Sequence, residues 1–291
     1  QVLSENYTVK ELELTEGFVP ADVDLLVVIA PQDMSDVEIY AIDQYLMRGG
    51  SLVVSAGNFV MLPDPYTGGL GLKEVQNGLK DALASYGVDI LEKLILDPQN
   101  EPFPVPVIRD ISGVQIREIQ AIDYPFFVDI RSNGMNSESP ILASLPALTL
   151  NWASPIEIED LDDEKHDTTV LLESSPESWV STDTNIQPDK DQYPEFGFPV
   201  GSDRKPYITG ISVVGEFVSY YADKQSPLEK IDDNTGDIIN PDAVGVLESS
   251  APDSRLVVIS SAEFLNDTVL ELSASMSGER YVNSLQFAQN V

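Results

Sequence analysis

Residues 22–58 constrain the fold more than any other stretch. An apolar run at residues 23–30 precedes an amphipathic segment that ends in two glycines, and a second apolar run, SLVVSAGN, follows. A strand buried in a parallel sheet carries apolar residues on both faces, as the first run does. Ser35 and Glu38 form a capping-box pattern, and Gly49 stands where a helix would end. The stretch predicts a β-α-β unit with parallel strands.

Composition excludes several classes of partner. The 291 residues include 49 acidic and 16 basic side chains, a formal net charge of −33. Such a charge repels phosphate, so we expect neither nucleic-acid binding nor docking on anionic lipid. The hydrophobic fraction of 42% is enough for a substantial core.

The chain contains no cysteine, which removes disulfides, thiolate metal sites and cysteine nucleophiles. It also lacks a run of about 18 apolar residues, the length of a membrane span. It begins at Gln1 without a visible signal peptide. We expect further strands upstream and any membrane anchor to lie outside this sequence.

Changes in composition suggest three parts. Residues 1–96 read as the first half of an α/β core, with a helix pattern from Leu72 to Tyr86 and short strands at 88–90 and 94–96. Residues 97–205 are broken by prolines and become strongly acidic, so they read as a β-rich insertion or subdomain. Residues 206–291 supply buried strands and a last helix, the second half of the core.

The best candidate for a ligand site follows from position in the expected sheet, not from a sequence motif. Ligands in open parallel sheets bind beyond the carboxyl ends of the strands. The side chains expected there form a tentative ligand cleft: Pro31, Gln32, Gly57, Asn58 and Glu263. A purely structural or degenerate cleft is the alternative.

No catalytic residues are predicted. A serine hydrolase would need Ser55 or Ser261 beside a base, and His166, in an acidic loop, is the single histidine. The glycines before Lys73 lack the Ser or Thr of a phosphate-binding loop. We therefore expect a protein without enzymatic activity and without a bound cofactor.

Calcium is the one metal that the sequence leaves open. Two acidic clusters suggest it, although neither has the order of an EF-hand loop. The first cluster contains Asp232, Asp233, Asn234 and Asp237, and the second contains Asp160, Asp162, Asp163 and Glu164. Polar turns are the alternative reading of both.

Five segments in order carry a family resemblance: VDLLVVIAP; IDQYLMRGGSLVVSAGN; LKDALASYGVDI with LILD; TTVLLESSPESWV; and RLVVISSAEFLND with YVNSLQFAQNV. Together they resemble the extracytoplasmic auxiliary proteins of uncharacterised ABC transport systems, including the gliding-motility-associated members. Ser260 replaces the family's glycine after the last strand, which is a departure from the pattern.

The resemblance implies an α/β fold, a parallel-sheet sandwich similar to the class I glutamine amidotransferase-like fold but without its cysteine. It also implies an extracytoplasmic domain, periplasmic or on the cell surface, that is membrane-anchored through segments outside this sequence. Its implied partners are the membrane and ATPase subunits of an ABC transporter. The family offers no established catalytic residues to carry over.

The primary functional hypothesis is a non-catalytic accessory domain of an ABC-type transport system, acting by binding a partner subunit or substrate. The first alternative is a small-ligand or carbohydrate-binding module in the strand-end cleft. Its aromatic side chains would have to face one pocket: Trp152, Trp179, Tyr220 and Tyr221. The second alternative is a divergent hydrolase of amidotransferase-like fold.

Overall fold

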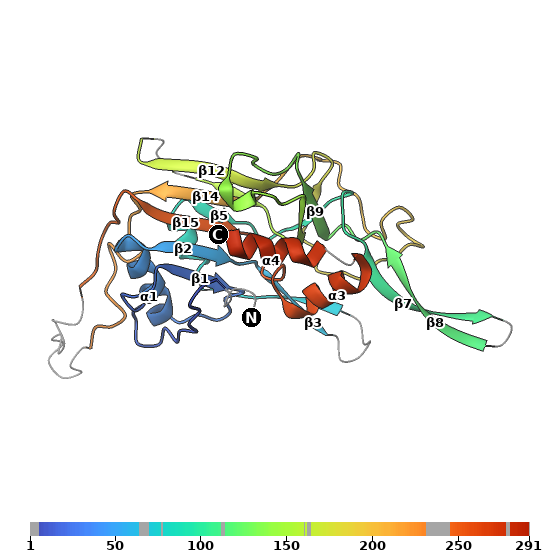
Figure 1. Ribbon diagram of the computed structural model, residues 1–291, viewed down its shortest axis with the longest axis horizontal. Coiled ribbons are helices and arrows are strands. Elements are labelled where there is room, and N and C mark those ends of the chain that lie inside the picture. Colours follow the sequence, from blue (N-terminus) through green and yellow to red (C-terminus); the bar gives the residue numbers. More distant parts are fainter. Residues whose placement is uncertain are drawn as a thin grey trace.

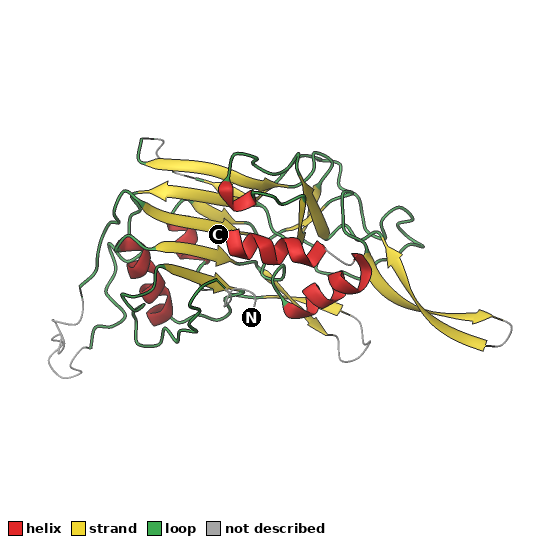
Figure 2. Ribbon diagram, viewed as in Figure 1, coloured by secondary structure: helices red, strands yellow, loops and turns green. Residues whose placement is uncertain are grey.

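The computed structural model describes residues 6–63, 70–76, 78–111, 114–159, 161, 164–230, 245–277 and 280–290. A five-stranded sheet lies at its centre (Figures 1 and 2). In spatial order its strands are β1 (Leu25–Ile29), β2 (Ser51–Ser55), β15 (Ser254–Ile259), β14 (Ile208–Gly215) and β12 (His166–Glu173).

The β-α-β prediction is confirmed. β1 pairs with β2 in parallel, and α1 (Asp36–Met47) connects them. The capping box at α1 is complete, because the Glu38 N–H donates to Ser35 Oγ and the Ser35 N–H donates to Glu38 Oε2. Gly49 adopts φ 93°, a left-handed conformation that glycine tolerates and that ends the helix.

The predicted fold class, a parallel-sheet sandwich of the amidotransferase-like type, is wrong. Only the β1–β2 and β2–β15 pairs are parallel among the described strands, and the protein is mostly strands in small antiparallel sheets, with 15% helix. β14 runs antiparallel to both of its neighbours, β12 and β15. Parallel strands require long crossover connections, usually helices, and no described helix lies between β12 and β15.

The remaining strands form five two-stranded antiparallel pairs. They are β3 (Phe59–Pro63) with β4 (Leu70–Glu74), β5 (Val88–Ile90) with β11 (Ile156–Ile158), β6 (Leu94–Leu96) with β13 (Trp179–Ser181), β7 (Phe103–Ile111) with β8 (Val114–Ile122), and β9 (Phe127–Arg131) with β10 (Ala147–Asn151). The other helices are α2 (Lys80–Ser85), the 3-10 turn η2 (Pro140–Leu142), α3 (Asp267–Ser277) and α4 (Arg280–Asn290).

The long helix expected from Leu72 to Tyr86 is also wrong at its beginning. Leu72 lies in β4, opposite Met61 of β3, and only α2 is helical. Tertiary pairing with β3 here overrides the local apolar period. The division at residues 96 and 205 stays a prediction, although β12, from the expected insertion, forms one edge of the central sheet.

Each face of the central sheet has its own cover. Leu52, Val54 and Val258 pack with residues of α1 and α2 in one core cluster. On the other face, Val53 and Val257 pack with β9, β10 and Phe287 of α4 in a second cluster. Figure 1 shows α4 lying across this second face. The sheet is therefore the middle layer.

The second cover does not reach β1. Leu25, Val27 and Ile29 are 38%, 43% and 46% exposed, whereas Leu26 on the opposite face is buried. The expectation that this strand is buried on both faces is thus wrong for one face. The reason is its place at the edge of the sheet, beyond the reach of β9, β10 and α4.

A buried carboxylate joins the helical layer to the loop after β14. Asp43 of α1 is fully buried, and its oxygens accept four hydrogen bonds. The donors are Tyr86 Oη (2.7 Å), the Tyr220 N–H (2.8 Å), Ser219 Oγ (2.7 Å) and Gln44 Nε2 (2.8 Å). These bonds compensate for removing the charge from water.

Replacing Asp43 by alanine should therefore destabilise the fold strongly. The hydroxyls of Tyr86 and Ser219 would lose their acceptor in a buried place, at a cost of roughly 3 kcal/mol in the free energy of unfolding. Urea denaturation measures this value. Asp253→Ala, in an exposed turn, is the control and should change it by less than about 0.5 kcal/mol. Equal effects of the two changes would contradict the structural role of Asp43.

Candidate functional site

The carboxyl ends of β1, β2 and β15 meet at one edge of the sheet. The Ala30 N–H donates to Ser55 O (2.8 Å), and the Ala56 N–H donates to Ile259 O (3.0 Å). The five residues of the predicted cleft follow these strands. Pro31, Gly57, Asn58 and Glu263 are buried and Gln32 is exposed.

Asn58 and Gly57 hold neighbouring main chain. Asn58 Nδ2 donates to the carbonyls of Ile90 (3.1 Å), the last residue of β5, and Leu91 (2.8 Å), which follows it. A Cβ added at Gly57 would lie 3.1 Å from Ala262 N, so the two chains approach closely at this point. Both residues therefore have structural duties here.

Glu263 is the most unusual group at this edge. It is only 3% exposed, and its Oε1 accepts a hydrogen bond from the Met61 N–H (2.9 Å). Its Oε2 is buried without a hydrogen-bond partner among the described residues. Burial raises the pKa of the Glu263 carboxyl, and this effect outweighs the opposing hydrogen bonds.

The loop after β10 packs against this edge. The Ser154 N–H donates to Ser260 O (2.9 Å), and Ser260 Oγ donates to Ser154 O. Ser261 Oγ donates to Asn151 O (2.7 Å), and Ser55 Oγ donates to Ser261 O (2.6 Å). The hydroxyls of Ser55, Ser260 and Ser261 are thus engaged with backbone carbonyls. Whether the five cleft residues bind a ligand stays a prediction.

His166 and these serines lie at opposite ends of the sheet. His166 is opposite Gly215, which in turn is opposite Ser254 at the start of β15. Ser261 follows the other end of β15, so a rise of about 3.3 Å per residue puts it roughly 20 Å away. The structure does not bring together the histidine and serines of a hydrolase site.

The SSPESWV segment surrounds a second buried carboxylate. Asp97, which follows β6, is fully buried. Its oxygens accept hydrogen bonds from the Ser175 N–H (2.7 Å), Ser175 Oγ (2.6 Å), Ser178 Oγ (2.8 Å) and the Gln99 N–H (2.8 Å). The segment therefore fixes a loop to β6, and its serines are already engaged.

The four aromatic residues considered for a ligand pocket are divided between two cores. Trp152 and Trp179 are buried in one apolar cluster, where Trp152 packs edge-on against Phe127. Tyr220 and Tyr221 pack into the cluster beneath α1. Their arrangement fits core packing.

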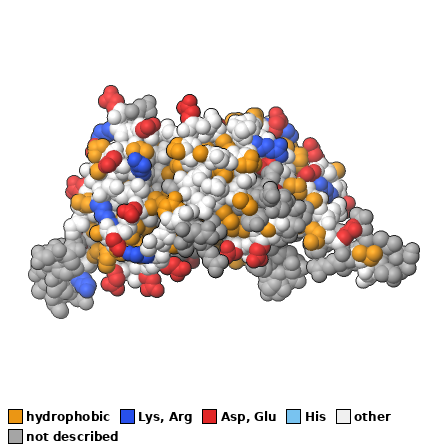
Figure 3. Space-filling model, viewed as in Figure 1, with side chains coloured by type: hydrophobic (Ala, Val, Ile, Leu, Met, Phe, Trp, Pro, Cys, Tyr) orange, Lys and Arg blue, Asp and Glu red, His pale blue; other side chains and the backbone are white. Residues whose placement is uncertain are grey.

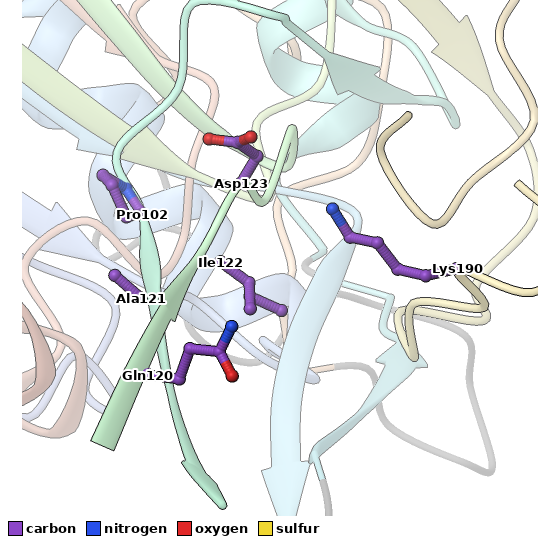
Figure 4. Close-up of a pocket in the computed structure, with 6 residues that line it drawn as sticks. All are labelled: Pro102, Gln120, Ala121, Ile122, Asp123 and Lys190. Atoms are coloured by element: carbon purple, nitrogen blue, oxygen red, sulfur yellow. The ribbon is translucent and has the colours of Figure 1, made fainter. Parts of the chain in front are cut away.

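A surface hollow lies elsewhere, away from the predicted cleft (Figure 4). It has a volume of about 460 Å³ and is open at one side. Its lining residues come from the base of β7 and β8 and from one distant loop: Pro102, Gln120, Ala121, Ile122, Asp123 and Lys190. Sequence reasoning missed it because Lys190 is about 70 residues from Asp123, and no local pattern connects them.

Metal ligands do not converge in the part of the chain that the structure describes, where three or more His, Asp or Glu side chains nowhere form a potential site. Of the residues considered for calcium, seven fall outside the described residues: Asp160, Asp162, Asp163, Asp232, Asp233, Asn234 and Asp237. Acidic side chains are spread around the rim of the face in Figure 3.

None of the described helices is long and apolar enough to cross a membrane.

Sequence reasoning also missed two exposed apolar surfaces. One is the stripe of Leu25, Val27 and Ile29 on β1. The other is the ribbon formed by β7 and β8, on which Ile116 is 44% and Ile119 is 62% exposed. Apolar residues on both faces of residues 103–122 were a signal available in the sequence.

Comparisons with known proteins agree with the resemblance found in the sequence. The family described as "ABC-type uncharacterized transport system" matches residues 1–291. An "Uncharacterized protein" of Borreliella burgdorferi is 25% identical over 228 residues, 77% of this chain and 42% of that protein, so this chain spans less than half of that relative. The solved mmIFT52 N-terminal domain is 11% identical, with a TM-score of 0.46, covering 99% of this chain and 87% of that one.

Glu263 should make stability depend on pH. Its pKa is higher in the folded than in the unfolded chain, so its contribution is fully present below about pH 4.5 and is lost as the pH rises through the folded-state value. Glu263→Gln removes this loss. The unfolding free energy of the wild type should therefore fall relative to the variant as the pH rises. Glu138→Gln, at an exposed site, is the control for the loss of one negative charge. If the difference in unfolding free energy between the wild type and Glu263→Gln does not change with pH, the raised pKa of Glu263 is refuted.

Proposed function

Because the chain belongs to the ABC-type uncharacterized transport system family, we propose that it is a non-catalytic accessory domain working outside the cytoplasm and binding the transporter's membrane subunit. The auxiliary role in an ABC-type transport system follows from the family. The chosen subunit, the absence of catalysis, the anchoring and the compartment are our proposals. The observation that supports a binding role is the projecting ribbon formed by β7 and β8.

The ribbon is built like an arm. Phe103 pairs with Ile122 at its base and Ile111 with Val114 near its tip, so the pairing runs along both strands. Figure 1 shows the ribbon extending away from the rest of the molecule. A two-stranded ribbon is only marginally stable in water by itself. An element of this kind gains stability from a partner that covers it.

The exposed side chains indicate the chemistry of that partner. Ile116 and Ile119 offer apolar surface on strand β8. The charged residues along the ribbon are two basic and two acidic, so its net charge is zero in a chain of −33: Arg109, Asp110, Arg117 and Glu118. An acidic partner is repelled less here than elsewhere. The ribbon thus suits an apolar extracytoplasmic surface of the membrane subunit.

The remaining chemistry supports binding rather than catalysis. Ser55 and Ser261 donate to backbone carbonyls, and Asp43 and Asp97 accept hydrogen bonds from structural donors. His166 lies at the other end of the sheet from the serines. These groups are placed to hold loops together.

Co-purification tests the proposal. The tagged chain is co-expressed with candidate ABC-transporter ATPase and membrane subunits from the same genome, and the proteins that elute with it are identified. We expect the membrane subunit to co-elute. Ile119→Asp should weaken its binding on the order of tenfold, because it buries a charge in the contact.

Val218 provides the matched control. It is as exposed as Ile119, at 62%, but lies in the loop after β14. Val218→Asp should leave the binding unchanged. If the wild-type chain retains neither transporter subunit, the binding role is wrong. If Ile119→Asp binds as well as the wild type, the ribbon is not the contact surface.

A further inference from the structure

We propose that β1 is a pairing edge for a second copy of this chain, which would join two central sheets across a two-fold axis at Val27. This inference is independent of the proposed transporter contact. It rests on the unpaired backbone of β1, its exposed apolar stripe and the distribution of charge around it.

The backbone of β1 is open on its outer side. The Ala30 N–H points toward β2, where it donates to Ser55 O. Backbone groups alternate along a strand, so those of Leu25, Val27 and Ile29 point away from β2. In the described part of the chain, β2 is the one strand that pairs with β1. These three residues therefore present N–H and C=O groups for another strand.

The opposite edge of the same sheet is protected. β12 has register irregularities at Leu172, and its outer side is bonded to a loop. The Asn136 N–H donates to Leu171 O (3.0 Å), and the Glu173 N–H donates to Gly134 O (2.8 Å). β1 has none of the usual protection, because Leu25–Ile29 contains no proline, charge or bulge.

A second copy fits this edge in one antiparallel register. A two-fold axis perpendicular to the sheet leaves the same face of both copies on the same side. Odd-numbered residues of β1 therefore stand opposite odd-numbered residues of the second copy. With the axis at Val27, Val27 faces its own copy and Leu25 faces Ile29 of the second copy. All three residues with outward backbone groups then exchange hydrogen bonds, and their side chains form one apolar surface.

The charge pattern favours the same register. Two chains of −33 repel each other, so a contact between copies requires an uncharged surface. Residues 25–32 are uncharged. In this register Asp24 faces Ala30 of the second copy and Asp22 faces Gln32, so the acidic flank of one strand never meets that of the other. Salt should strengthen the dimer by screening the repulsion elsewhere.

Mass measurement over a concentration series tests for the dimer. Light scattering coupled to size exclusion should show the purified 31.9 kDa chain associating to twice that mass, more strongly in higher salt. Val27→Lys places two like charges opposite each other and should abolish the dimer. Val218→Lys, at an exposed site in the loop after β14 and outside the β1 edge, should keep it. A wild type that stays monomeric at its highest soluble concentration would overturn the proposal.

The cysteine-free chain allows the register to be tested directly. Opposed Cα atoms in a hydrogen-bonded antiparallel pair are about 5.5 Å apart, within disulfide range. Val27→Cys should therefore form a covalent dimer on mild oxidation. Leu25→Cys alone should not, because its two thiols would lie four residues apart, about 13 Å. A mixture of Leu25→Cys and Ile29→Cys chains should cross-link. A Val27→Cys chain that cross-links no faster than Val218→Cys would refute the register, even if Val27→Lys fails to fold.

Discussion

The pairing of β2 with β15 is the contact on which the rest of the structure depends. It joins residue 51 to residue 255 in a parallel ladder and so unites distant parts of the chain. Val54 and Val258 are fully buried in this ladder, and both faces of the two strands are covered. The other strands of the central sheet flank this pair: β1 lies beside β2, and β14 and then β12 lie beyond β15. The helical and β layers are positioned by its two faces.

Buried carboxylates attach the loops to this frame. Asp43 and Asp97 belong to different core regions, yet each accepts hydrogen bonds from serine hydroxyls and backbone N–H groups. A loop held only by apolar contacts could slide, whereas these bonds have fixed directions. This explains why sequence segments that identify the family, such as SSPESWV, have structural roles.

The sequence predicted the local elements better than their assembly. The β-α-β unit and the short strands β5 and β6 were evident, because apolar periodicity and the cap at Ser35 act locally. The strand directions of β12 and β14 depend on connections without helices, and β4 depends on pairing with β3. Sequence reasoning did not predict α3, which spans Asp267–Ser277. For the candidate site, the sequence predicted which residues follow the strand ends. It did not predict that the hydroxyls of Ser260 and Ser261 donate to the carbonyls of Ser154 and Asn151, because these residues are more than 100 positions away in the chain.

Charge connects the fold to its two exposed apolar surfaces. A net charge of −33 makes association with most acidic proteins unfavourable over much of the surface. The β1 edge is uncharged and the β7–β8 ribbon has zero net charge, so the electrostatic penalty for contact is smallest where backbone or apolar groups are also exposed. The two surfaces belong to different sheets and can be occupied independently. Under the two proposals, the acidity of the chain disfavours contact elsewhere, and local neutrality favours contact at these two elements.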